Sequence, residues 1–375
     1  MSQLRPMIIV LLMLTSALAG CLDENIVQDT ESEDIGLSNC NSGDGVFSSS
    51  MIEFDITNNP DFSNIGGIEY DCDSNLLYGY AWDSVEEVEH FISINTSTGV
   101  VSSLVELTGI DYVSAHSTYS DNEYFAVMRG NNIDYLVNIN IDDPSQFTLI
   151  EFDFSDHPEL DNVGGIEYNY SGDIIYGYAG DDSNSQPPAS NNQPPSIIMP
   201  TPYVITINTT TGYVTKYSEL ENIDSVMNGG SSFDGSSYYL SVRDDEGGYS
   251  MANISVYDFS ISTSTVIATS NEDLTSVSGF EINSSTGLIY GYGHDSVNEE
   301  WVFLSYDIST ESILEIGVLT DVEYVTSYST IGGADFYAIM AGSDRVNKLV
   351  YITVSYTHLR AHETSLHLVC RLLLE

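Results

Sequence analysis

Charged side chains that could bind a ligand recur at one position of a repeated pattern. An Asp ends each of three Tyr-rich segments, and an Arg stands at or near the equivalent position of three related segments between them. These residues are Asp83, Arg129, Asp181, Arg243, Asp295 and Arg345. Arg binds carboxylates and sulfates through paired hydrogen bonds, and Asp can coordinate a cation. Two interpretations fit: a charged ligand face, or structural ion pairs and capped turns worth about 0 to 1 kcal/mol each.

A second set of carboxylates recurs within the same pattern. Glu69, Glu167 and Glu281 each occupy the third position of a GIEY or GFEI segment. If the repeats surround an axis, these carboxylates face a common channel and could coordinate Ca²⁺. A solvated channel lining is the alternative, because no ligand spacing of the EF-hand type accompanies them. No other cofactor is indicated.

The remaining residues of the usual metal-binding types show no such recurrence. His90, His116, His157 and His294 share no repeat position and no zinc spacing, so we expect them at the surface.

The segments that must position these residues occur as three repeats in the sequence. GIEYDCDSNLLYGY (67–80), GIEYNYSGDIIYGY (165–178) and GFEINSSTGLIYGY (279–292) align without a gap, 98 and 114 residues apart. A Pro-rich loop within 181–202 accounts for the longer spacing. Each long repeat divides into two halves, and each half predicts four strands in roughly 45 to 50 residues, as in a β-propeller blade. Three double repeats predict an all-β, six-bladed propeller over residues 49–354.

The segment before the first repeat predicts how the ring closes. Residues 51–70, MIEFDITNNPDFSNIGGIEY, match residues 149–168, where LIEFDF is the fourth strand of a blade. The last half-repeat shows only three strands, so we expect residues 49–57 to supply its fourth and to cover an open edge. If the gene is truncated, eight blades are the alternative.

Tyr-Gly strands and hairpins of the type Asn/Asp-x-Thr-Gly resemble those of extracellular propellers with YVTN-type or quinoprotein-like repeats. The resemblance covers residues 49–354 and implies architecture, not activity. The repeated Trp that docks quinoprotein blades is absent, since the chain has only Trp82 and Trp301. In such a ring, structural Arg residues should pair with carboxylates of neighbouring blades.

The N-terminus has the organisation of an export signal. Arg5 precedes the apolar run 7–14, which is followed by small residues. Leu18-Ala19-Gly20-Cys21 resembles a prokaryotic lipobox, which implies cleavage of residues 1–20, lipidation of Cys21 and an extracytoplasmic protein anchored to the cell membrane. A soluble secreted protein is the alternative. Residues 21–48 are acidic and predict a disordered tether.

Two further features concern the cysteines and the C-terminus. Cys40 and Cys72 predict a disulfide in an exported protein, with two free thiols as the alternative. Residues 355–375 resemble translated sequencing-adapter read-through, with a genuine C-terminal helix as the alternative.

The net charge of −48 opposes binding to nucleic acid. The sequence therefore favours a binding module for a glycan, a peptide or a protein partner. An extracellular hydrolase or lyase acting on glycans is the alternative, although no recurring nucleophile, base and orienting residue supports it.

Overall fold

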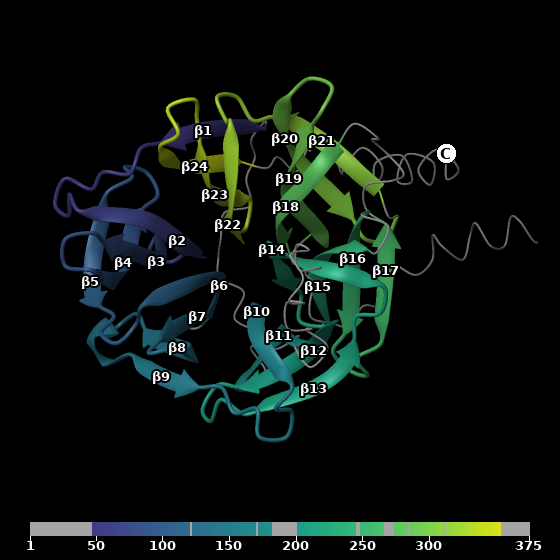
Figure 1. Cartoon of the computed structure of the whole chain (residues 1–375). Coiled ribbons are helices and arrows are strands. Elements are labelled where there is room, and N and C mark those ends of the chain that lie inside the picture. The colour runs from purple at the N-terminus through teal and green to yellow at the C-terminus, as the bar shows by residue number, and fades with distance from the viewer. Residues whose placement is uncertain are drawn as a thin grey trace, which may run out of the picture. The chain divides into compact units, whose positions relative to one another are not determined.

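The chain folds as a six-bladed β-propeller (Figure 1). The computed structural model describes residues 47–120, 122–169, 172–181, 201–244, 248–265, 274–283, 286–310 and 312–353. Six four-stranded antiparallel sheets succeed one another around a central channel, and the first strand of each lies innermost. The predicted fold class and blade number are confirmed. Within these ranges, no helix is long and apolar enough to cross a membrane.

The strands follow the half-repeats of the sequence. Blade 1 contains β2 (Phe62–Asp71), β3 (Leu76–Asp83), β4 (Val88–Asn95) and β5 (Val101–Glu106). Blade 2 contains β6 (Tyr112–Ser120), β7 (Glu123–Gly130), β8 (Ile133–Asn140) and β9 (Thr148–Glu151), with a 3₁₀ turn, η2 (Pro144–Gln146), before β9. Blade 3 contains β10 (Leu160–Asn169), β11 (Ile174–Asp181), β12 (Thr201–Asn208) and β13 (Val214–Glu219). Blade 4 contains β14 (Ile223–Phe233), β15 (Ser237–Asp244), β16 (Tyr249–Ser255) and β17 (Ile261–Thr265). Blade 5 contains β18 (Leu274–Asn283), β19 (Leu288–Asp295), β20 (Glu300–Asp307) and β21 (Ser312–Val318). Blade 6 contains β22 (Tyr324–Gly332), β23 (Asp335–Ala341), β24 (Asn347–Thr353) and the N-terminal β1 (Ser48–Ile52).

The ring closes through the N-terminal strand, as the sequence predicts. β1 pairs antiparallel with β24, with Met51 opposite Val350. Beyond β1, Asp55 exchanges backbone hydrogen bonds with Gly99 and Val101 of blade 1. Asp153 makes the same bonds to the corresponding hairpin of blade 3. The sequence match between residues 51–70 and 149–168 therefore reflects one structural role, which covers the edge that β24 would otherwise expose.

The apolar cores lie between neighbouring blades. One core joins Tyr78 and Phe91 of blade 1 to Tyr124 and Val137 of blade 2. Another joins Ile339 and other residues of blade 6 to blade 1, so that the last and first blades are packed together as well as closed by β1. Residues on both faces of the middle strands of each blade are therefore buried. Polar side chains can contact a ligand at the ends of the strands and in the channel.

Candidate functional site

Glycine bulges in the innermost strands determine which side chains reach the channel. Gly67, Gly165 and Gly279 have φ of 58°, 56° and 66°, a backbone region that favours glycine. At the same place the pairing with the next strand shifts, between Gly66 and Glu69 in blade 1. A Cβ on Gly67 would lie 2.3 Å from the Tyr80 ring, so any other residue at this position would clash with Tyr80. Ile68 is buried and Glu69 faces the channel as a result.

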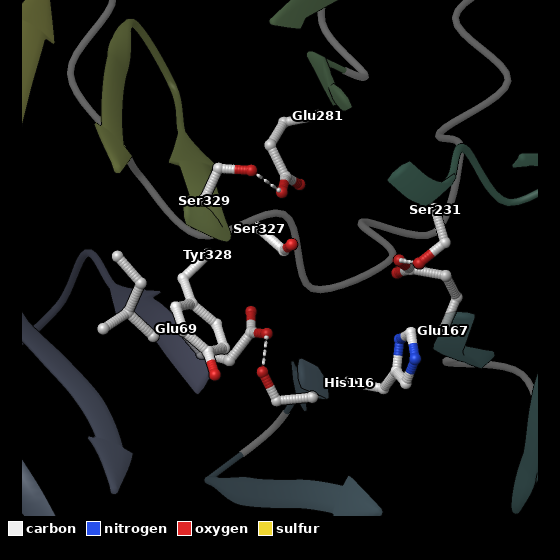
Figure 2. A pocket seen from close by; sticks show the side chains of 10 residues that line it. Glu69, His116, Glu167, Ser231, Glu281, Ser327, Tyr328 and Ser329 are labelled. Atoms are coloured by element: carbon white, nitrogen blue, oxygen red, sulfur yellow. Dashed lines mark hydrogen bonds between the residues drawn. The ribbon is translucent and has the colours of Figure 1, made fainter. Parts of the chain in front are cut away.

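The three glutamates that the sequence singled out line one cavity in the channel. Figure 2 shows their carboxylates pointing inward from three directions. Each accepts a hydrogen bond from a serine on the next blade: Ser117 to Glu69 at 2.7 Å, Ser231 to Glu167 at 2.9 Å and Ser329 to Glu281 at 2.9 Å. We call these six residues the Glu/Ser ring. Odd blades supply the acids and even blades supply the donors.

Burial raises the pKa of all three carboxyl groups. The side chains are partly exposed to the lumen, but the lumen itself is enclosed by protein, so the charged form loses hydration. Desolvation raises the pKa of Glu69 to about 8, against the lowering effect of the Ser117 hydrogen bond. Desolvation, followed by the charge of Glu69, raises the pKa of Glu167 to about 8. Desolvation, then Glu167 and Glu69, raises the pKa of Glu281 well above its usual value.

The cavity is small, and the described residues that line it include no Lys or Arg. Its volume is about 50 Å³, and His116, Ser327, Tyr328 and the Glu/Ser ring line it. Desolvation lowers the pKa of His116 to about 4, so this imidazole is neutral at pH 7. Its Nδ1 accepts the Gly165 backbone N–H at 3.0 Å. A water molecule occupies about 30 Å³ in the liquid. The site can therefore hold water or one small ion.

The three repeated aspartates lie at the ends of second strands, as the sequence pattern implies. Asp83 Oδ1 accepts the backbone N–H groups of Val85 and Glu86, both at 2.8 Å. Asp295 makes the same turn with Val297 and Asn298. Asp181 is buried at the end of β11. The backbone donors lower the pKa of Asp83 and Asp295, since they stabilise the charged form.

The three arginines differ from one another. Arg129 binds Asp134 through two hydrogen bonds, Nε to Oδ1 at 2.5 Å and the second terminal nitrogen to Oδ2 at 2.7 Å. Asp134 is its partner on the paired strand β8, not a residue of a neighbouring blade as expected for a structural Arg. The Arg345 guanidinium lies over the Tyr324 ring, 5.4 Å from its centroid. Arg243 is exposed and has no ion pair with another described residue.

The six charged residues of the sequence pattern share one end of the blades, and none of them is among the described residues that line the channel cavity. Their role as a ligand face stays a prediction.

Sequence reasoning missed the serines and placed His116 wrongly. His116 lines the cavity instead of lying at the surface. Ser117, Ser231 and Ser329 are 114 and 98 residues apart, the same two spacings as the repeats, so their recurrence was available as a signal. Each is the first paired residue after a register shift in its strand, which is why it reaches the channel.

Several predictions concern the ends of the chain. Cys72 is disulfide-bonded, and Cys40 lies outside the described residues, so the pairing of the two stays a prediction. The signal segment, Cys21, residues 21–46 of the predicted tether and residues 355–375 also lie outside them, whereas Ser48, predicted to belong to the tether, begins β1.

Comparison with known proteins supports the fold. No protein-family model and no curated protein sequence matches the chain. Oligogalacturonate lyase from Vibrio parahaemolyticus is similar, with a TM-score of 0.51 at 11% identity, over 84% of this chain and 98% of that one. An oligogalacturonate lyase in complex with manganese gives 0.50 at 10% identity, over 85% and 99%. TolB from Acinetobacter baumannii gives 0.46 at 10% identity, over 75% and 64%. At these identities the likeness to the two lyases shows the propeller fold alone.

Proposed function

We propose that the chain is a membrane-anchored, extracytoplasmic interaction module that binds a protein partner through one end of the propeller. This end, called here the 2–3 face, carries the turns between the second and third strands of each blade. The observation behind the proposal is that apolar side chains are exposed in or directly after four of these turns. Val85 is 70% exposed, Ile133 37%, Val297 66% and Val346 56%.

The composition of the 2–3 face fits a protein partner. Turn tips are normally polar, and here apolar side chains recur at the same turn of several blades. Tyr112 and Tyr324 begin the innermost strands of blades 2 and 6 at the same end, and are 64% and 44% exposed. Arg129 and Arg345 lie beside them in these blades. Tyr and Arg are enriched in protein interfaces.

The size of the channel cavity disfavours glycan chemistry there. Sites for small molecules usually enclose about 300 to 1,000 Å³, whereas this cavity has a volume of about 50 Å³. The module proposed here uses the channel for one small cation, Ca²⁺, held by Glu69, Glu167 and Glu281. Three carboxyl groups with no Lys or Arg among the described residues that line the cavity support this part of the proposal, because a cation would replace their protons.

The proposed location rests on the lipobox-like sequence at residues 18–21. Lipidation at Cys21 would hold the propeller outside the cytoplasm, with residues 21–48 as the tether. A lipid chain would fix it to the membrane without a spanning helix.

The interaction is tested by capture from the membrane fraction that contains the protein. The full-length chain is crosslinked in intact cells, purified, and compared with Val85→Ser/Val297→Ser/Val346→Ser and with Tyr257→Ser. Tyr257 is 83% exposed in the β16–β17 turn, at the opposite end of a blade, and serves as the matched control. We expect the triple variant to lose a crosslinked protein that the wild type and Tyr257→Ser retain. Identical crosslinked species in all three samples would refute the assignment of the 2–3 face.

A further inference from the structure

Three side chains of metal-ligand type meet in one hairpin of blade 1, outside the channel. Asp83 ends β3, Glu86 lies in the following turn and His90 lies on β4. Each offers one ligand atom, and these atoms lie within 4.8 Å of one another. None of the three belongs to the Glu/Ser ring, and His90 was expected to be a surface residue without a role.

Blade 5 builds the same turn with different side chains, and the comparison shows what the turn itself requires. Asp295 Oδ1 accepts two backbone N–H groups, as Asp83 Oδ1 does. Asn298 then donates its side-chain N–H to Asp295 Oδ2 at 2.8 Å. Glu86 occupies the position of Asn298 in blade 1, and an ionised carboxylate has no proton to donate. Blade 1 therefore brings a second acceptor to this turn, where blade 5 provides a donor.

The imidazole of His90 is oriented toward the two carboxylates. Its Nδ1 is 3.0 Å from Ser103 Oγ, and its ring packs against Phe62 with centroids 5.0 Å apart. The Nε2 atom is buried without a hydrogen-bond partner among the described residues, 4.0 Å from Glu86 Oε2. The side chain of His90 is only 12% exposed. The corresponding residue of blade 5 is Val302, so the hairpin does not need a histidine.

We propose that Asp83, Glu86 and His90 form a binding site for a divalent transition metal, with Zn²⁺ as the best fit. One imidazole nitrogen and two carboxylate oxygens are ligands that zinc accepts, whereas Ca²⁺ takes oxygen ligands. Bonds of about 2.0 to 2.2 Å place tetrahedral ligands roughly 3.3 Å apart, so the present spacing needs only a small contraction. The Glu86 side chain is 64% exposed and free to make this movement. Water completes the coordination.

Ser103 acts as a positioning residue for this site. When Ser103 accepts the Nδ1 proton of His90, the Nε2 lone pair faces Asp83 and Glu86, which is the tautomer that a metal requires. The metal would also neutralise two carboxylates that have no donor between them. Val85 lies between Asp83 and Glu86 in the sequence, so a bound metal would hold this turn of the 2–3 face in one conformation. The metal-site proposal does not depend on the proposed role of that face.

The test is a calorimetric titration of the chelator-treated, full-length protein with ZnCl₂ at pH 7. The key variant is Glu86→Asn/His90→Val, which installs the residues that blade 5 carries at these positions. We expect it to bind one Zn²⁺ fewer than the wild type, with an unchanged Tm in chelator. Ser103→Ala should weaken this site about 10- to 100-fold. His157→Val is the control, because His157 has one carboxylate neighbour, Glu159 at 3.7 Å, and should leave the stoichiometry unchanged.

A second readout needs no variant. Addition of Zn²⁺ to protein labelled with ¹⁵N at histidine should shift the Nε2 resonance of one buried imidazole and fix its Nδ1–H tautomer. Equal stoichiometry and affinity in the double variant would overturn the proposal. Displacement of Zn²⁺ by an equal concentration of Mg²⁺ would do so as well, because it would show general attraction to acidic residues and no role for His90.

Discussion

The Glu/Ser ring should make the stability of the propeller depend on pH, and replacement of one acid should remove part of that dependence. Glu69→Gln is the informative change. The Gln side chain keeps the length of Glu and an oxygen that can accept the Ser117 hydrogen bond, but it cannot ionise. The variant therefore isolates the charge of Glu69 from its packing.

The size and sign of the effect follow from the raised pKa of Glu69, which goes from its usual 4.5 to about 8. The folded state holds this proton more tightly than the unfolded state does. The contribution to stability is therefore complete below pH 4.5 and is lost as the pH rises through 8. At 1.36 kcal/mol per pH unit the loss amounts to about 5 kcal/mol for one isolated group, and water in the lumen reduces it to roughly 2 to 4 kcal/mol. We expect Glu69→Gln to match the wild type at pH 5 within about 1 kcal/mol and to exceed its stability by roughly 2 to 4 kcal/mol at pH 8 to 9.

Urea denaturation between pH 5 and 9, with a chelator present, measures this difference. Glu221→Gln is the control, because Glu221 is exposed and should give the wild-type profile. Parallel pH profiles for Glu69→Gln and the wild type would refute the desolvation argument. If Ca²⁺ occupies the ring, its addition at pH 8 should stabilise the wild type and not Glu69→Gln, since binding to the folded state alone raises stability.

Three other predictions concern the anchor, the closure and one hairpin. Cys21→Ser should release the protein from the membrane fraction, as tested by fractionation and immunoblotting; retention without accumulation of precursor would contradict lipidation. A chain that begins at Phe54 should aggregate and melt at a lower temperature than one that begins at Phe47, because only the longer chain keeps β1 over the β24 edge, and equal Tm and elution volume would contradict this role. Gly99→Ala should cost about 1 to 3 kcal/mol more than Gly109→Ala in urea denaturation, because both have positive φ but only a Cβ on Gly99 meets a backbone oxygen, Glu53 O at 2.1 Å. Equal losses would show that backbone strain alone matters there.

The architecture was predictable because a repeated sequence must repeat its structure. The three GIEY and GFEI segments gave the innermost strands, and the 98-residue period gave pairs of blades. The match of residues 51–70 to 149–168 predicted closure, because only an equivalent strand would carry an equivalent sequence. These inferences concern which strands pair. The pattern of apolar residues and turn residues indicates the strands and hairpins directly.

Side-chain partners were less predictable, because they depend on bulges and short turns that shift a residue by one position. Arg129 pairs with Asp134 across its own hairpin, since the two-residue turn at Asn131 and Asn132 sets those residues opposite each other. His116 reaches the channel beside a register shift between Val113 and Ser117. The periodicity of the sequence does not indicate where a bulge changes the direction of the following side chains. It therefore did not predict the partner of Arg129 or the position of His116 in the channel.

The alternation of acid and hydroxyl around the channel gives a physical reason for the double-blade repeat. Six carboxyl groups in a cavity of about 50 Å³ would repel one another when ionised and would lack donors when desolvated. With Ser117, Ser231 and Ser329 in alternate blades, every carboxyl group receives one hydrogen bond from its neighbour in the same double repeat. Odd and even blades therefore differ in the side chains that they place in the channel, although both have the same arrangement of four strands. A unit of two blades is the smallest one that satisfies the ring, and it is also the unit that the sequence repeats.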